Sequence, residues 1–160
     1  MALHIDFVEP EIPPNTGNIA RTCAATDSVL PLVKPLGFSI DDRSLKRAGL
    51  DYWPYVTLEI HESLEDFMRK YGPGGEDRRM FLATTKGKHL YTEIAYRDGD
   101  MLLFGRETAG LPLDFIAAHE ENAIRIPMSR DTRLRSFNLA NSANIILFEA
   151  LRQLGFPGLL

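Results

Sequence analysis

The sequence predicts an α/β fold: a single domain covering residues 1–160, with a mostly parallel sheet flanked by helices. Two observations predict this class. Short apolar segments of strand-like composition alternate along the chain with segments of helical periodicity, which is the pattern of a parallel sheet. The length of 160 residues, with 44% hydrophobic and 25% charged residues, is ordinary for one globular domain that buries its own core.

The first half of the chain predicts strands that are each followed by a loop and a helix. The expected strands span residues 3–8, 30–34 and 56–60, and the expected helices span 19–25, 43–47 and 63–71. Residues 11–18, between the first strand and helix, are rich in turn-forming residues, and Asn15 among them is a candidate N-cap. Such a junction places loop amides and a helix N-terminus at the carboxyl end of a strand, where open α/β sheets bind ligands.

The second half repeats a simpler pattern of apolar strand and polar loop. Strands are expected at 80–83, 101–104 and 124–126, and each is followed by a loop of small or polar residues. A helix is expected at 113–119 after the second of these loops. Because the carboxyl ends of parallel strands lie at one edge of a sheet, the three loops are expected to line one pocket.

The last helix has more polar residues at its start than a helix cap requires. It opens on residues 136–142 (SFNLANS), and apolar residues recur at three-to-four spacing from Leu139 to Leu154. Ser136 or Asn138 is a plausible N-cap, and one capping residue is enough. Either this is a well-capped structural helix, or the loop and first turn hold a ligand. The same two interpretations apply to Glu107, on a loop between two glycines.

Composition and charge limit the classes of function. A net charge of −4 argues against a general nucleic-acid coating protein, so any RNA contact has to be local. Arg43, Lys46 and Arg47 lie on adjoining turns of a short helix and form either a solvated face or a phosphate contact. One cysteine, Cys23, excludes an internal disulfide, and the four histidines show no zinc-binding spacing, so no metal is expected. No apolar run is long enough to span a bilayer and no signal peptide is recognisable, so no membrane partner and a cytoplasmic location are expected.

Three motifs, in order and with consistent spacing, resemble those of the SPOUT class of RNA methyltransferases, in its SpoU/TrmH branch. They are residues 15–22 (NTGNIART), residues 103–112 (LFGRETAGLP), and residues 126–128 (IPM) together with 136–141 (SFNLAN). Within that branch, residues 9–18, 47–52, 84–87 and 152–155 resemble the enzymes that methylate the 2′-hydroxyl of cytidine or uridine 34 in tRNA. The glycine-rich fingerprints of dinucleotide-binding and P-loop proteins are absent from the sequence.

The resemblance implies a SPOUT fold whose C-terminal part forms a trefoil knot. It also implies S-adenosylmethionine as the cofactor, a homodimer, and the tRNA anticodon loop as the RNA partner, with leucine tRNAs as the expected substrates. Two alternatives remain open. The chain could methylate a ribose of another tRNA or of rRNA, or it could be a nonenzymatic RNA-binding or nucleotide-binding α/β module.

Functional positions of the family carry over where the motifs match. The expected catalytic residues are Asn15, Arg21, Ser136 and Asn138. The expected cofactor-binding residues are Thr84, Gly105, Glu107, Ile126, Met128, Ser136 and Phe137. RNA contact is expected from the basic helix and from the loop before Ser136, through Arg43, Lys46, Arg47, Arg130, Arg133 and Arg135.

Arg21 is the family residue most often given the task of removing the proton from the ribose hydroxyl. An arginine is a poor base because its pKa exceeds roughly 12, so we expect Arg21 to act as a cation that holds a phosphate and stabilises developing alkoxide charge. The sequence departs from related enzymes at Arg106, which is often proline, and in the arginine-rich loop, which is about two residues longer. Both departures concern the shape of the cofactor loop and the RNA contact, not the reaction.

Overall fold

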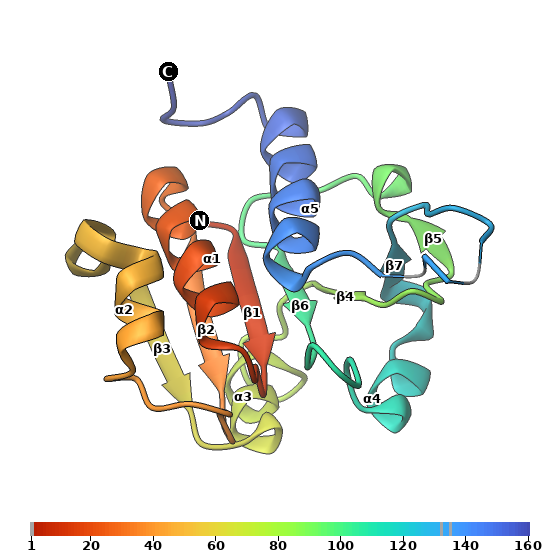
Figure 1. The fold of residues 1–160 in the computed structure, drawn as a ribbon. Coiled ribbons are helices and arrows are strands. Elements are labelled where there is room, and N and C mark those ends of the chain that lie inside the picture. The colour runs from red at the N-terminus through yellow and green to blue at the C-terminus, as the bar shows by residue number, and fades with distance from the viewer. Residues whose placement is uncertain (1, 132, 135) are drawn as a thin grey trace.

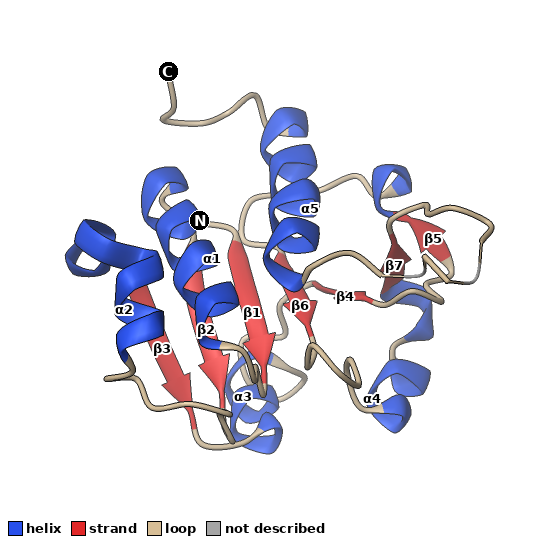
Figure 2. Cartoon of the chain, in the orientation of Figure 1, coloured by secondary structure: helices blue, strands red, loops and turns tan. Residues whose placement is uncertain are grey.

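The computed structural model describes residues 2–131, 133–134 and 136–160, and its centre is one seven-stranded parallel sheet (Figures 1 and 2). The strand order is β3-β2-β1-β6-β4-β7-β5, and every pair of neighbours is parallel. The strands are β1 (His4–Val8), β2 (Val29–Val33), β3 (Thr57–His61), β4 (Met80–Ala83), β5 (His89–Leu90), β6 (Met101–Phe104) and β7 (Ala123–Arg125). The predicted α/β class with a mostly parallel sheet is therefore confirmed.

Helices cover both faces of the sheet. One layer contains α1 (Pro13–Thr26), α2 (Arg43–Gly49) and α5 (Leu139–Gln153), which lie in front of the sheet in Figure 1. The other contains α3 (Leu64–Tyr71) and α4 (Leu113–Ala118), whose apolar residues pack on the second core. Short 3-10 helices occur at η1 (Leu50–Tyr55), η2 (Tyr91–Glu93) and η3 (Glu120–Asn122). No helix in the described part of the chain is long and apolar enough to cross a membrane.

Each layer has its own core. On the α1 and α5 side, Ile5 and Phe7 of β1 pack with Ile19 of α1 and with Ile146 and Leu147 of α5. On the α3 side, Val8, Leu82 and Leu103 pack with Phe67 and Tyr71. All five residues of β1 are buried because helices cover both of its faces, and they include the polar side chains of His4 and Asp6.

The first helix begins six residues earlier than the sequence suggested. Helix α1 starts at Pro13, because proline at the first turn needs no hydrogen-bond partner for its missing N–H and already has a helical φ. The interpretation of Asn15 as the N-cap is wrong: the N-cap is Ile12, which makes no side-chain capping bond, and Asn15 is buried within the first turn. Its side chain is thereby free to face the sheet edge instead of its own helix.

The last helix begins at Leu139, not at Ser136, and Asn138 is its N-cap, as one of the two candidates predicted. The Asn138 side-chain oxygen accepts a hydrogen bond from the Asn141 N–H at 3.2 Å. The sequence analysis missed β5 and η1, because a two-residue strand has no periodicity and Pro54 lies inside η1. Arg135, one of the predicted RNA-binding residues, lies outside the described residues.

Candidate active site

A cavity of about 640 Å³ lies at the carboxyl edge of β4, β6 and β7, between the N-termini of α1 and α5. The loops after these three strands all contribute to its wall, so the structure brings together the three loops that the sequence assigned to one pocket. The sequence-predicted site residues that line it are Asn15, Thr84, Gly105, Glu107, Ile126, Met128, Ser136, Phe137 and Asn138.

The loop after β6 is a tight turn that forms one wall of the cavity. Arg106 and Gly110 pair through two backbone hydrogen bonds, with N···O distances of 3.2 and 2.8 Å. A Cβ atom at Gly105 would lie 2.1 Å from the backbone of Gly110 and Leu111, so only glycine allows the two sides of the turn to approach this closely. Gly110 has a φ of +71°, which L side chains rarely adopt.

Glu107, at the tip of this turn, caps helix α1 from across the site. One carboxylate oxygen accepts from the Glu11 N–H at 2.9 Å, and the other accepts from the Ile12 N–H at 2.6 Å and from Asn15 Nδ2 at 3.3 Å. A negative charge at a helix N-terminus is favourable because the first-turn N–H groups and the helix dipole are positive there. The capping group that residues 11–15 lack thus comes from more than 90 positions later in the chain.

Asn15 connects Glu107 to the start of α5. Its side-chain oxygen accepts from Asn138 Nδ2 at 2.9 Å, while its own Nδ2 donates to Glu107. Asn138 in turn caps α5 through its side-chain oxygen. The side chains of the three sequence motifs therefore form one hydrogen-bonded chain from Glu107 through Asn15 to Asn138, which fixes the relative positions of the loop after β6, α1 and α5.

The cavity has an apolar interior and a polar rim. Phe104, Leu111, Ile124 and Ile146 are buried beneath it. Hydroxyl groups come from Thr84 and Ser136, which also line it. Lys86, Arg106 and Arg125 add positive charge to the lining. An apolar pocket with a few polar groups at its edge is the usual form of a small-molecule site.

Arg21 lies outside this cavity. It is exposed on α1, and its guanidinium carbon lies 4.8 Å from the centre of the Tyr52 ring, in η1. This stacking is a cation–π contact, which orients the guanidinium without using any of its N–H donors. The predicted catalytic arginine and the predicted cofactor residues are thus not brought together within one chain.

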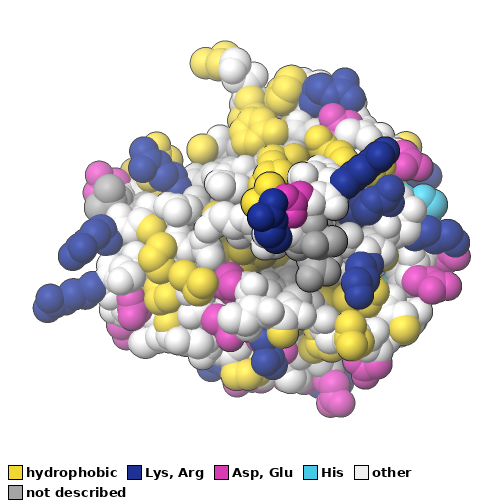
Figure 3. All heavy atoms as spheres, turned by 45° about the vertical axis from the view of Figure 1, so that its right-hand side comes forward, with side chains coloured by type: hydrophobic (Ala, Val, Ile, Leu, Met, Phe, Trp, Pro, Cys, Tyr) yellow, Lys and Arg dark blue, Asp and Glu magenta, His cyan; other side chains and the backbone are white. Residues whose placement is uncertain are grey.

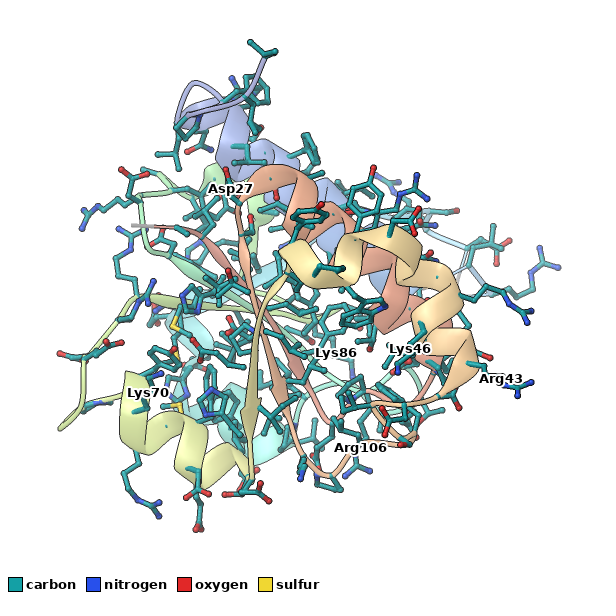
Figure 4. The ribbon with its side chains drawn as sticks, turned by 90° about the vertical axis from the view of Figure 1, so that its left-hand side faces the viewer. Asp27, Arg43, Lys46, Lys70, Lys86 and Arg106 are labelled. Carbon is teal, nitrogen blue, oxygen red and sulfur yellow. The ribbon has the colours of Figure 1, made fainter. Side chains whose placement is uncertain are left out.

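The basic helix α2 is also separate from the cavity. Arg43, Lys46 and Arg47 are exposed on α2, which packs beside α1 (Figure 4). Lys46 forms an exposed ion pair with Asp41 at 3.4 Å. Asp42 caps α2 through hydrogen bonds from the Ser44 and Leu45 N–H groups.

The arginine-rich loop lies between β7 and α5. Arg130 is exposed, and Arg133 forms an ion pair with Asp131 at 2.6 Å. This pairing lowers the pKa of Asp131. The face that carries β5, β7 and this loop shows several separate groups of Lys and Arg, with acidic side chains among them (Figure 3).

Sequence reasoning missed several residues that the structure brings to the cavity. Ile12, Lys86 and Arg125 line it, although none of them was assigned a role. Lys86 follows Thr84 in a loop that was noted only for its small and polar residues. Arg125 is the last residue of β7 and lies between Ile124 and Ile126, which line the same cavity, so the alternation of side chains along the strand gave no signal for it. Among the described residues, no group of three or more His, Cys, Asp or Glu could hold a metal ion.

The parallel sheet and the three converging loops are those of a known class, the RNA methyltransferases of the SpoU type. Residues 2–148 match the sequence model described as the SpoU rRNA Methylase family, and the chain belongs to that family.

Individual relatives are similar to this chain over nearly its whole length. The Escherichia coli (strain K12) protein named tRNA (cytidine(34)-2'-O)-methyltransferase is 46% identical over 157 residues, which cover 98% of this chain and 96% of that protein. A solved structure described as structural insights into the 2-OH methylation of C/U34 on tRNA has a TM-score of 0.88 and 42% identity, covering 96% of this chain and 97% of the other. The AdoMet-bound rRNA methyltransferase from Sinorhizobium meliloti has a TM-score of 0.82 and 27% identity, covering 96% of this chain and 57% of that one.

Proposed function

We propose that this protein is an S-adenosylmethionine-dependent methyltransferase that modifies the 2′-hydroxyl of nucleotide 34, cytidine or uridine, in the tRNA anticodon loop. The observation that carries the proposal is the convergence on one cavity of three motif loops that are far apart in the sequence. The relative and the solved structure that share 46% and 42% identity with nearly the whole chain carry names with the same activity. Leucine tRNAs remain the expected substrates.

The cavity fits the cofactor in size and in chemistry. Its volume of about 640 Å³ lies within the range of small-molecule sites, roughly 300–1,000 Å³. An apolar interior suits the adenine ring, and the hydroxyls and backbone groups at the strand ends suit the ribose and the amino-acid part. The residues expected to hold it are Thr84, Gly105, Glu107, Ile126, Met128, Ser136 and Phe137. Glu107 would act mainly by fixing the loop, because three protein donors already occupy its carboxylate.

When bound, S-adenosylmethionine supplies an electrophilic methyl group on a sulfonium. Transfer is an in-line displacement in which the ribose 2′-oxygen bonds to the methyl carbon as the carbon–sulfur bond breaks and the hydroxyl proton leaves. Such a reaction depends mainly on positioning. Ser136 and Asn138, at the cavity rim, would orient the ribose or the cofactor, and Asn15 would hold Asn138 in place.

Arg21 requires a second copy of the chain to take part. Because Arg21 lies outside the cavity of its own chain, we infer a homodimer in which the arginine of one copy reaches the cavity of the other. Exposed apolar side chains at Ile12, just before α1, and at Phe137 and Phe148, around α5, support such an interface. The guanidinium would then hold a phosphate and stabilise the developing alkoxide. The trefoil knot of the SPOUT fold stays a prediction, which tracing an experimental backbone would test.

A mixing experiment tests the role of Arg21. Arg21→Ala should abolish methylation while leaving the affinity for S-adenosylmethionine nearly unchanged. Mixing it with a Gly105→Ala variant, which we expect to lose the cofactor, should restore up to one active site per mixed dimer. Normal turnover of Arg21→Ala alone would exclude the proposed role, and absence of any restored activity would argue against action between copies.

The tRNA would contact the basic residues through its phosphates. Single-stranded loops expose 2′-hydroxyls and bases, so an anticodon loop is a suitable substrate for such an enzyme. The candidates are Arg43, Lys46 and Arg47 on α2, with Arg130, Arg133 and Arg135 in the arginine-rich loop. Arg43→Ala should weaken tRNA binding and reduce its salt dependence by about one unit of slope, and an unchanged slope would exclude this contact.

The decisive experiment is mass spectrometry of tRNA from a strain lacking the gene, compared with the same strain carrying it. Loss of one 2′-O-methyl group at nucleotide 34 supports the proposal. Loss of a 2′-O-methyl from another tRNA position or from rRNA would identify a different substrate. A purified protein that binds tRNA but gives no calorimetric signal with S-adenosylmethionine would instead be a binding module.

A further inference from the structure

Two loops that are nearly 100 residues apart are joined by a reciprocal pair of carboxylates. Glu107, after β6, accepts hydrogen bonds from the N–H groups of Glu11 and Ile12. In return, Glu11 Oε1 accepts from the Thr108 N–H at 3.1 Å and from the Thr108 hydroxyl at 2.7 Å. We call this arrangement of Glu11, Glu107 and Thr108 the clasp.

An ion pair adds a further contact between the same two loops. Arg106, which is labelled in Figure 4, forms an ion pair with Glu9 at 3.1 Å. Hydrogen bonds from the Thr108 hydroxyl and N–H hold the pKa of Glu11 below its usual range, and Arg106 contributes to this as well. Glu9 adopts a φ of 54°, a left-handed conformation that is uncommon outside glycine. The ion pair of Glu9 and the hydrogen bond from its N–H to the Val33 carbonyl, with an N···O distance of 2.8 Å, hold the chain in this turn.

The clasp lies between the two parts of the site that have to act together. On one side, residues 105–111 form a wall of the cavity in which we place the cofactor. On the other, residues 11–15 begin α1, which carries Asn15 toward Asn138 and, further along, Arg21. The clasp therefore links this wall of the cavity directly to the N-terminus of α1. Besides the clasp, the side-chain hydrogen bonds between residues 105–111 and residues 9–15 in the described chain join Asn15 to Glu107 and Arg106 to Glu9.

We propose that Glu11 and Thr108 are positioning residues that couple the cofactor loop to helix α1, so that a bound cofactor orders the helix that carries Asn15 and Arg21. The inference rests on the proposed function, because it needs a cofactor in this cavity. Thr108 lines the cavity and Glu11 does not, and neither is assigned a part in the transfer itself. Their contribution is to hold α1 at the distance at which transfer occurs, and small misplacements of reacting groups can slow a reaction by orders of magnitude.

Hydrogen exchange with S-adenosylhomocysteine as the probe tests this coupling without requiring turnover. In the parent protein, the probe should slow exchange both in the loop 105–111 and at the first turn of α1, residues 11–18. In Glu11→Ala and Thr108→Val, protection should persist in the loop and fall severalfold at residues 11–18. Glu11→Gln keeps an accepting oxygen and should restore part of the protection. Glu62→Ala removes an exposed carboxylate that pairs with Lys34 at the far edge of the sheet, and it serves as the matched control.

Kinetics provide the second measurement. With tRNA, each clasp variant should lower kcat about tenfold and raise the KM for S-adenosylmethionine no more than about threefold. The double variant should be no worse than the more affected single variant, because both remove one interaction. Full protection of residues 11–18 in both clasp variants, or independent multiplicative losses in kcat, would overturn this inference alone. Absence of probe binding to the parent protein would instead overturn the proposed function, which the inference requires.

Discussion

Replacing Asp6 by Asn tests how burial of its carboxylate changes the stability of the folded protein. The residue lies in the centre of β1 and is fully buried, and among the described residues neither of its oxygens has a hydrogen-bond partner. The His4 ring lies beside Asp6, and the distance of 3.8 Å from His4 Nδ1 to Asp6 Oδ1 is too long for a hydrogen bond. Burial raises the pKa of Asp6 from 3.8 to about 6. Repulsion from Glu59 acts in the same direction, and the attraction of His4 and Arg78 opposes it. Replacement by Asn removes the charge and keeps the shape.

The sign and the magnitude follow from proton binding. Because the folded pKa is above the unfolded one, the folded protein binds the proton more tightly between about pH 4 and pH 6. The contribution of Asp6 to the free energy of unfolding is therefore fully present below pH 4 and is lost as the pH rises through 6. A shift of about two pKa units corresponds to roughly 3 kcal/mol. The free energy of unfolding of Asp6→Asn minus that of the parent should thus rise by roughly 3 kcal/mol as the pH goes from 4 to 8.

Urea unfolding of both proteins at pH 4, 5, 6, 7 and 8 measures this difference. His4, Glu59 and Arg78 are present in both proteins, so the two proteins differ only at position 6. Asp98→Asn makes the same change of charge at an exposed position and is the control. A difference in unfolding free energy that stays constant from pH 4 to pH 8 would refute the reasoning.

Three further predictions concern the site. Gly105→Ala should abolish binding of S-adenosylhomocysteine in calorimetry, because the new Cβ would lie 2.1 Å from the backbone of Gly110 and the turn would have to open. Glu107→Ala should lower the free energy of unfolding by about 1–2 kcal/mol, or roughly 2–8 °C in Tm, because α1 loses its cap; an unchanged melting curve would contradict this. Tyr52→Leu should lower the single-turnover rate severalfold and Tyr52→Phe should not, because the phenyl ring preserves the stacking on Arg21. Equal rates for the two Tyr52 variants would show that the stacking does not matter.

Several features of the fold could be predicted because they depend on local patterns. Apolar runs at β4 and β6 and the amphipathic α3 were located to within about a residue, since period and composition report directly on burial. The N-cap role of Asn138 was also a local signal. The start of α1 was misplaced because Pro13 and Pro14 were interpreted as turn residues, although proline suits a first helical turn equally well.

The contacts within the site depend on distant parts of the chain. No local pattern around Glu107 indicates that its carboxylate caps a helix that begins at Pro13, because the N–H groups it accepts from are more than 90 residues away. Arg106, a departure from related sequences, pairs with Glu9 for the same non-local reason. The separation of Arg21 from the cavity follows from its position on α1, where its guanidinium stacks on Tyr52, away from the side that carries Asn15.

By itself, the sequence determined the α/β class, the strands whose loops form the site, and the membership of a methyltransferase family, because alternation, length and motif spacing are properties of the chain in order. Only the tertiary structure decided how those loops meet: Glu107 caps α1, Asn15 accepts a hydrogen bond from Asn138, and Glu11 accepts one from Thr108. The physical reason is that hydrogen bonds and ion pairs form between groups that folding brings within about 3 Å, whatever their separation along the chain.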